Sequence, residues 1–226
     1  MITSQQHGFT LWELLITMLV AGILLGIGVP NVMEFQRNGA MTAAGNNVVT
    51  GVLMARTESV KRQAPVAFCL SDDATTPTPT CSPNSVVDSA TRGFVVWVDE
   101  NNNQDANGAR ILTDATDGNA VIDAGELVLM QSAAPGGTVR VSANCGYVSF
   151  APTGFTRQAG ALCFPANRAI LFCDDRGRRR AAGALSAARI VRVDRLGRAQ
   201  VLVEEAAVNP FITALAAGGI NATCPP

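Results

Sequence analysis

The sequence predicts an α+β fold in which one long N-terminal helix packs against an antiparallel β-sheet domain. Residues 9–29 form an almost wholly apolar run, and apolar positions near helical spacing continue to about residue 64. From residue 65 the pattern changes to short β-like runs separated by Gly, Pro, Asn and Asp. The 226 residues are enough for one good-sized domain with a segment or two besides.

The apolar run is long enough to cross a lipid bilayer. As a helix, residues 9–29 would extend about 32 Å, which matches the hydrocarbon core of a bilayer. The preceding stretch MITSQQHG contains no Lys or Arg, and no small-residue cleavage site follows the run. A secretory signal peptide has a basic start and a small-residue cleavage site. Because this sequence lacks both, the run is predicted to be a transmembrane helix.

One carboxylate, Glu13, lies inside the apolar run. A charged side chain within a membrane helix costs about 3 kcal/mol on insertion scales unless it is paired or reaches the interface. One interpretation places Glu13 among the lipid headgroups. The other gives it a positive partner, and the run contains no basic residue. Cleavage after Gly8 would create an α-amine at Phe9, and in a packed array this amine of a neighbouring molecule would reach Glu13.

The second half of the helix is predicted from apolar residues near helical spacing, ending before Pro65. These residues are Val48, Val49, Val52, Leu53, Ala55 and Val60. Gly39, Gly45 and Gly51 lower the intrinsic helix stability by up to about 1 kcal/mol each relative to Ala. Such a helix needs a sheet to pack against.

The stretch GFTLWELLITMLVAGILLGIGVP, from Gly8 to Pro30, resembles the N-terminus of type IV pilins and type II secretion pseudopilins. The resemblance implies that a prepilin peptidase cuts between Gly8 and Phe9 and methylates the new amine of Phe9. It also implies that Glu13 neutralises a neighbour's amine during assembly. Pro30 matches a proline where pilin helices loosen, and a proline within a helix favours a kink.

Four later blocks narrow the resemblance to the GspH/FimT family of secretion pseudopilins and minor pilins. They are VVTGVLMARTESVKRQAPVAFC, GFVVWVDENNN, YVSFAPTGF and ARIVRVDRLGRAQV, in the family's order. The implied location is a single pass through the inner membrane, with the C-terminal domain in the periplasm. The implied segments are a leader at 1–8, a transmembrane and filament-core helix at 9–29, the amphipathic half of that helix at 30–64, a β domain at 65–201 and an extension at 202–226.

Six cysteines are predicted to form disulfides, because export to the periplasm favours oxidised thiols. They are Cys69, Cys81, Cys145, Cys163, Cys173 and Cys224. No C-x-x-C pair occurs and His7 is the one histidine, which argues against a zinc site of the usual kind. Six cysteines allow 15 pairings. We expect Cys69 to pair with Cys81, since the sequence between them reads as a loop between strands.

The acidic segment from Asp99 to Glu126 has two interpretations. It is either a solvated, turn-rich insertion or a calcium-binding loop. An EF-hand loop places oxygen ligands at its first, third and fifth positions and a glutamate at its twelfth. Taking the last acidic residue of the segment as the twelfth leaves the sixth position without its usual glycine. The candidate calcium ligands are Asp114, Asp117, Asn119, Asp123 and Glu126. The insertion is the preferred interpretation, and no other cofactor is expected.

Residues 168–198 contain nine of the 17 basic residues of the chain and only three acidic ones. Some minor pilins that resemble this architecture bind DNA through a Gly-Arg-x-Arg motif near the C-terminus. The candidates for DNA contact are Arg178, Arg179, Arg180 and Arg198. The alternative is an arginine-rich surface that pairs with acidic neighbouring subunits or with the acidic loop of the same chain. We favour this alternative, because Gln200 stands where the motif has its second arginine.

No enzyme constellation is present in the sequence. His7 would be removed with the leader, which leaves no histidine for a catalytic pair. The sequence therefore predicts a structural subunit, a minor pseudopilin or minor pilin that helps prime or cap a periplasmic filament. The expected partners are other pilins or pseudopilins, the prepilin peptidase and the inner membrane. The alternative function is a surface-displayed minor pilin that binds DNA for uptake.

Overall fold

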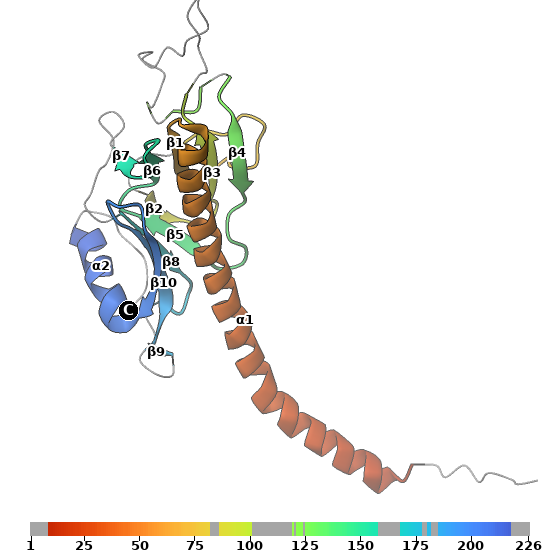
Figure 1. The fold of residues 1–226 in the computed structure, drawn as a ribbon. Helices are drawn as coiled ribbons and strands as arrows, with labels where there is room; N and C mark the ends of the chain where they lie inside the picture. Colours follow the sequence, from red (N-terminus) through yellow and green to blue (C-terminus); the bar gives the residue numbers. More distant parts are fainter. Residues whose placement is uncertain are drawn as a thin grey trace, which may run out of the picture. The chain divides into compact units, whose positions relative to one another are not determined.

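The computed structural model describes residues 9–81, 86–100, 119, 121–123, 125–157, 168–177, 180–181 and 185–217. The chain divides into two compact units, Met1–Gly39 and Ala40–Pro226. One helix, α1 (Leu11–Arg62), contributes to both units (Figure 1). Pro30 lies inside α1, and the helix continues past it.

The described residues of the N-terminal unit are Phe9, Thr10 and the first part of α1. Its large apolar side chains are exposed, from Phe9 at 87% and Leu11 at 79% to Val29 at 51%. This part of α1 is long and apolar enough to cross a membrane, and no residue of its most apolar stretch is buried in the protein. Such a surface is stable in lipid and unstable in water.

In the second unit, the remainder of α1 buries one face. The buried residues recur every three or four positions, as expected for a helix that packs along one side. They are Met41, Ala44, Gly45, Val48, Gly51, Val52, Ala55 and Ser59. Two apolar residues of the predicted pattern, Leu53 and Val60, are instead 45% and 46% exposed. The buried face of α1 therefore includes two glycines that the apolar pattern does not reveal.

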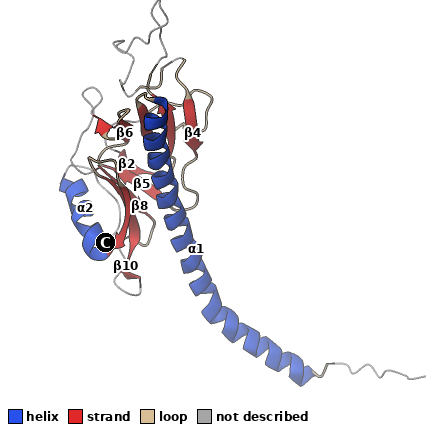
Figure 2. Cartoon of the chain, viewed as in Figure 1, coloured by secondary structure: helices blue, strands red, loops and turns tan. Residues whose placement is uncertain are grey.

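The β domain contains two antiparallel sheets (Figure 2). Their strands are β1 (Val66–Ser71), β2 (Val86–Ser89), β3 (Gly93–Val98), β4 (Val128–Ser132), β5 (Arg140–Ala143), β6 (Tyr147–Phe150), β7 (Thr156–Arg157), β8 (Arg168–Cys173), β9 (Arg180–Ala181), β10 (Leu185–Val193) and β11 (Ala199–Glu204). The first sheet has the order β4-β3-β1-β6-β7 and the second the order β11-β10-β8-β5-β2, with β9 paired to β10. The α+β architecture predicted from the sequence is confirmed.

The main core lies between α1 and both sheets. Phe68 of β1 and Phe94 of β3 pack their rings 5.0 Å apart, and Phe172 of β8 belongs to the same apolar cluster. Side chains alternate between the faces of a strand. Accordingly, Ile170 and Phe172 lie in the α1 cluster, whereas Ala169 and Leu171 lie in a second cluster on the opposite face.

A second helix, α2 (Glu205–Ala217), covers that opposite face. Its residues Val208 and Ile212, four positions apart, are buried against β8 and β10 together with Ile190. Figure 1 shows α2 along the side of β10 that faces away from α1. The β domain therefore continues past residue 201, where the sequence analysis ended it, because β11 reaches Glu204 and the apolar sheet face needs α2 to exclude water.

Candidate functional site

The start of α1 is capped by Thr10, the residue before the helix, and by Glu13 in its first turn. The Thr10 backbone N–H and hydroxyl both donate to Glu13 Oε2 at 3.3 Å, and the Glu13 backbone N–H donates to Thr10 Oγ1 at 3.3 Å. This reciprocal arrangement is a capping box, in which two side chains satisfy backbone donors at a helix N-terminus. The positive end of the helix dipole also favours a carboxylate at this position.

The capping box places the Glu13 carboxylate within one helical turn of Phe9. Its atom Oε2 accepts the Thr10 bonds, and among the described residues Oε1 has no hydrogen-bond donor. Lipid headgroups and a neighbour's amine are the partners expected from the sequence, which leaves out the local partner, Thr10. The Thr-x-x-Glu spacing before an apolar run was the signal for it. Gly8, the other residue of the predicted cleavage site, lies outside the described residues.

The fold places the arginines of residues 168–198 in different environments. Arg168 and Arg189 are buried, at 2% and 8% exposure, and burial lowers the pKa of both guanidinium groups. Arg176 forms an ion pair with the buried carboxylate of Asp174 at 2.6 Å. A basic surface built from the whole segment is therefore excluded, because part of its positive charge is inside the domain or neutralised.

Arg189 has a structural role in β10. The pairing register of β10 with β11 shifts between Leu185 and Ile190, which leaves an irregular stretch of backbone. Arg189 Nη1 donates to the carbonyl oxygens of Ser186, Ala187 and Ala188 in that stretch. A buried carbonyl without a donor is destabilising, so the guanidinium supports the bulge.

Two of the remaining DNA-contact candidates, Arg180 and Arg198, have a described backbone. Arg198 is exposed in the turn between β10 and β11, where its backbone N–H donates to Asp194 Oδ1 at 2.9 Å. Arg180 is in β9, whose partner on β10 is Ser186 at the opposite end of that strand. The length of β10 places the backbones of these two residues about 20 Å apart. Arg178 and Arg179 lie outside the described residues.

Three of the five calcium candidates come together in one turn. Asn119 Nδ2 donates to Asp123 Oδ2 at 2.8 Å, and the Asp123 backbone N–H donates to Glu126 Oε2 at 2.9 Å. These bonds hold the turn that leads into β4. Among the described residues, no group of three or more His, Cys, Asp or Glu side chains has a geometry that would hold a metal ion. Asp114 and Asp117 lie outside those residues.

Disulfide bonds cross-link the β domain. Cys69 of β1 is bonded to Cys81 across a Cα–Cα distance of 5.7 Å, which is the pairing expected from the sequence. Cys145 and Cys173 are also disulfide-bonded, while Cys163 and Cys224 lie outside the described residues.

Asp73 organises the loop that the Cys69–Cys81 bond closes. Its carboxylate accepts from the Thr80 backbone N–H at 2.7 Å and from the Ser71 hydroxyl at 2.7 Å. The Thr80 N–H is the main reason why the pKa of Asp73 lies below its ordinary value. The covalent bond and this carboxylate therefore act on the same loop.

Comparison with known proteins agrees with the N-terminal helix and the β domain described above. Residues 44–197 match the model of the type II transport protein GspH, and residues 3–29 match the prokaryotic N-terminal methylation motif. The chain belongs to the GspH family of pilin-type subunits. No curated protein matches its sequence. The two family matches confirm the resemblance inferred from the sequence. The family consists of structural subunits that are not enzymes.

Solved structures of a minor pilin show a distant likeness. One crystal form of the Pseudomonas aeruginosa type IV minor pilin FimU is 14% identical and covers 74% of this chain and 92% of its own, with a TM-score of 0.42. A second crystal form is also 14% identical and covers 71% and 91%, with a TM-score of 0.38.

The family match and the N-terminal helix together fit a membrane-anchored pilin with a periplasmic domain. Membership of the family also implies assembly with other pilins or pseudopilins.

Proposed function

We propose that this GspH-family chain is a minor pseudopilin or minor pilin that helps prime or cap a periplasmic filament. The filament would be a type II secretion pseudopilus or a type IV pilus. One observation carries the proposal: a capping box holds the Glu13 carboxylate at the first turn of an exposed apolar helix. That position is next to the amine that cleavage before Phe9 would create.

In this proposal Glu13 changes partners during assembly. While the subunit is in the inner membrane, Thr10 satisfies Oε2 at the helix start. After the prepilin peptidase has acted, the Phe9 amine of one subunit pairs with Glu13 of its neighbour as the helices enter the filament core. Ion pairing is strong where water is excluded, and an unpaired carboxylate would be costly there.

Intact-mass analysis of the membrane-extracted protein tests the processing step. We expect the loss of residues 1–8 and the addition of one methyl group. A mature N-terminus at any position other than Phe9 would contradict the proposal.

Two substitutions at Glu13 separate its charge from its capping role. Glutamine also completes a capping box, so Glu13→Gln keeps the cap and loses only the charge. Alanine loses both. We expect both variants to insert in the membrane and both to lose most of their incorporation into filaments, at least tenfold. Normal incorporation of Glu13→Gln would show that capping is the whole role of the carboxylate.

Thr10→Val is the matched control. It removes the hydroxyl that takes part in the cap, while the carboxylate and the cleavage site are unchanged. We expect this variant to be incorporated far better than either Glu13 variant, because the charge remains.

The DNA-uptake alternative is less favoured because Gln200 stands where the motif has its second arginine, and because the backbones of Arg180 and Arg198 lie near opposite ends of β10. If phosphates are the partner, affinity must fall steeply with salt, since each neutralised phosphate releases counterions. We expect no gel shift of double-stranded DNA at physiological salt, and no effect of Arg198→Ala on filament incorporation. A salt-sensitive shift that Arg198→Ala removes would favour the DNA receptor.

A further inference from the structure

Large apolar side chains are exposed at two places in the second unit. Among its described residues, six of them are about half exposed, between 45% and 53%. The first group is Leu53, Val60, Phe155 and Leu196, and the second group is Val121 and Leu127. Single exposed apolar residues are common on protein surfaces, whereas clusters of them mark contact surfaces. Each group is therefore a candidate contact surface.

The first group lies where three segments of the domain meet. Arg56 Nε donates to the carbonyl oxygen of Gly154 at 3.0 Å, which joins α1 to the turn before β7. The Thr156 hydroxyl donates to the carbonyl oxygen of Arg195 at 2.7 Å, which joins β7 to the turn between β10 and β11. The exposed apolar residues of α1 and of the two turns therefore lie on adjoining segments.

An exposed arginine borders this first group. Arg195 lies on the β10 side of its turn, and no ion pair of its side chain is found in the ranges that the structure describes. Arg198 lies on the other side of the same turn, directly before β11. We call Val60, Phe155, Leu196 and Arg195 the basic patch.

The second group carries the opposite charge. Val121 and Leu127 lie in the turn before β4, together with Asp123 and Glu126. The Val121 backbone N–H donates to Asn119 Oδ1 at 2.6 Å, and Asn119 Nδ2 donates to Asp123 Oδ2 at 2.8 Å. Because these bonds fix the turn before any partner binds, less conformational entropy is lost on binding. We call Val121, Asp123, Glu126 and Leu127 the acidic patch.

The two patches lie at the same end of the first sheet but at its opposite edges. Val66 of β1 is paired with Val98 at the end of β3 and with Phe150 at the end of β6. β4 begins beside Trp97, and β7 begins beside Phe150. These two strands are the edges of the sheet, on either side of the last turns of α1 in Figure 1. Four strand spacings, about 19 Å, separate them, so the acidic patch does not reach the basic patch of its own chain.

We propose that the basic patch of one copy binds the acidic patch of a second copy placed beside it. The apolar members of the two patches cover each other, and Asp123 faces Arg195. Charge selects this occupant, because opposite charges across an interface favour the right partner and like charges reject the wrong one. The acidic patch also ends a stretch, from Asp99 to Glu126, with seven acidic residues and one basic residue.

The two patches are different surfaces of one chain, so the contact is heterologous. Contacts of this type form rings or open helical rows of subunits. A helical row is the arrangement of subunits in a filament. The inference deepens the proposed filament role and rests on it, because it names the surface by which one subunit would meet the next.

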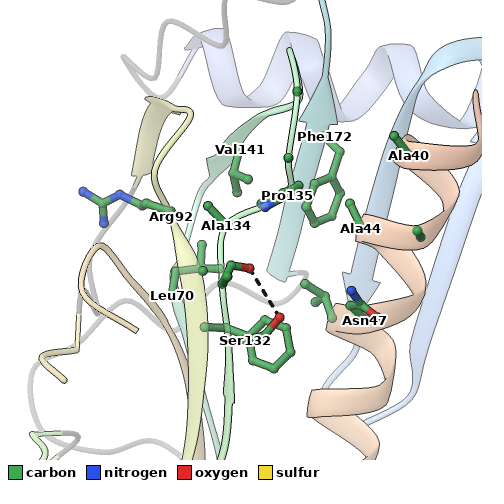
Figure 3. Close-up of a pocket in the computed structure, with 17 residues that line it drawn as sticks. Ala40, Ala44, Asn47, Leu70, Arg92, Ser132, Ala134, Pro135, Val141 and Phe172 are labelled. Carbon is green, nitrogen blue, oxygen red and sulfur yellow. Dashed lines mark hydrogen bonds between the residues drawn. The ribbon is translucent and has the colours of Figure 1, made fainter. Parts of the chain in front are cut away.

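A cavity beside α1 belongs to neither patch. Its volume is about 490 Å³, and it is lined by Ala40 and Ala44 of α1 and by Ala134 and Pro135 of the loop between β4 and β5 (Figure 3). It lies beside Ser132, the last residue of β4, whereas the acidic patch precedes the first residue of that strand. Ala134→Leu, which narrows the cavity, is therefore a control for the contact.

Photo-crosslinking of the full chain in detergent tests the contact. The photoreactive residue p-benzoylphenylalanine replaces Phe155 in a probe copy, which is mixed with an unmodified ¹⁵N-labelled copy. We expect crosslinked peptides that join position 155 of the probe copy to residues 119–129 of the ¹⁵N-labelled copy. Adducts only with detergent, only with another segment of the second copy or only within one copy would each overturn the proposal.

Charge reversal in mixed copies sharpens the test. Arg195→Glu in the probe copy, or Asp123→Arg in the ¹⁵N-labelled copy, should each lower the crosslink yield at least fivefold, because like charges would then face each other. Mixing the two altered copies should restore at least half of the yield, because the pair is formed again with its charges exchanged. An unchanged yield with Arg195→Glu would refute the contact, as would a failure of the two folded variants to restore it.

Three controls change residues outside the patches. Arg198→Ala alters the neighbouring arginine, Glu204→Arg reverses an exposed acidic residue at the end of β11, and Ala134→Leu alters the cavity. Each should leave the yield within twofold, and an equal loss in all three would show that the contact does not depend on the patches. Arg195 is exposed, so Arg195→Glu remains informative if Asp123→Arg does not fold.

The crosslink assay uses no peptidase and no filament machinery. A failure of the proposed function would instead appear as a different mature N-terminus or as normal incorporation of Glu13→Gln. The two hypotheses therefore fail in different experiments.

Discussion

Gly51 is predicted to be required by the packing of α1 against the first sheet. A Cβ at position 51 would lie 2.6 Å from Phe94 Cε2 and 3.2 Å from Phe68 Cε2. Both rings are buried, at 3% and 0% exposure, and they pack against each other. The distance to Phe94 is shorter than a real Cβ contact, so Gly51→Ala forces a shift of the ring or of the helix.

Gly45 is the matched control on the same buried face. A Cβ there would lie 3.7 Å from Val201 Cγ1 and 3.8 Å from Val191 Cγ2, which are ordinary contact distances. Gly45→Ala should stabilise the domain by about 0.5–1 kcal/mol through helix propensity. Gly51→Ala has the same propensity gain but an overpacking penalty of about 1–3 kcal/mol. We therefore expect the two variants to differ by about 2 kcal/mol, with Gly51→Ala the less stable.

Urea unfolding of the detergent-purified chain measures this difference. Trp97 is fully buried and reports on the core, and Trp12→Phe removes the other tryptophan. With a slope of about 2 kcal/mol per molar urea, the midpoints should differ by roughly 1 M. Equal midpoints at equal slopes would refute the packing argument, because they would show that the rings adjust freely to a methyl group at position 51.

Three further predictions concern the rest of the β domain. Cys69→Ser with Cys81→Ser should lower the free energy of unfolding by about 3 kcal/mol, because a loop with a sequence separation of 12 is no longer closed; an unchanged urea midpoint would contradict this. Asp73 has a lowered pKa in the folded state, so its contribution is present above the ordinary carboxyl pKa and is lost as the pH falls through the folded value. Asp73→Asn should thus reduce the loss of stability between pH 6 and pH 3, and a wild-type pH profile would count against it. Ile212→Ala should cost about 2–5 kcal/mol, whereas the exposed Thr213→Ala should change stability by less than about 0.5 kcal/mol; equal effects would show that α2 does not stabilise the domain.

The fold class was predictable because it depends on local periodicity. The change from helical spacing to short β-like runs near Pro65 separates α1 from β1, and the structure has that boundary. The packing of α1 was less predictable. Gly45 and Gly51 weaken a helix in isolation, and their use as points of close approach depends on Val201 and Phe94, which come from distant strands.

The arginine segment shows a second limit of the sequence. Its density of positive charge indicates a basic surface, whereas burial depends on tertiary structure. Arg168 and Arg189 are buried by neighbouring strands, and Arg176 is paired with Asp174. The packing of α2 on the sheet was not predicted for a related reason: the resemblance ended near Val201, and an apolar spacing within α2 gives no indication of the sheet face that it covers.

In the proposed function, the position of Glu13 meets two needs at once. In the membrane a carboxylate without partners would hinder insertion, and the bonds from Thr10 reduce that cost. These bonds are long, at 3.3 Å, so they do not hold the carboxylate strongly against a better partner. A methylated amine at Phe9 of a neighbour would be such a partner in the water-free core of a filament. An unprocessed subunit has no free amine at that position and therefore offers its neighbour nothing to pair with. In the proposed function, the capping box thus keeps the charge tolerable before assembly, and cleavage decides which subunits are able to assemble.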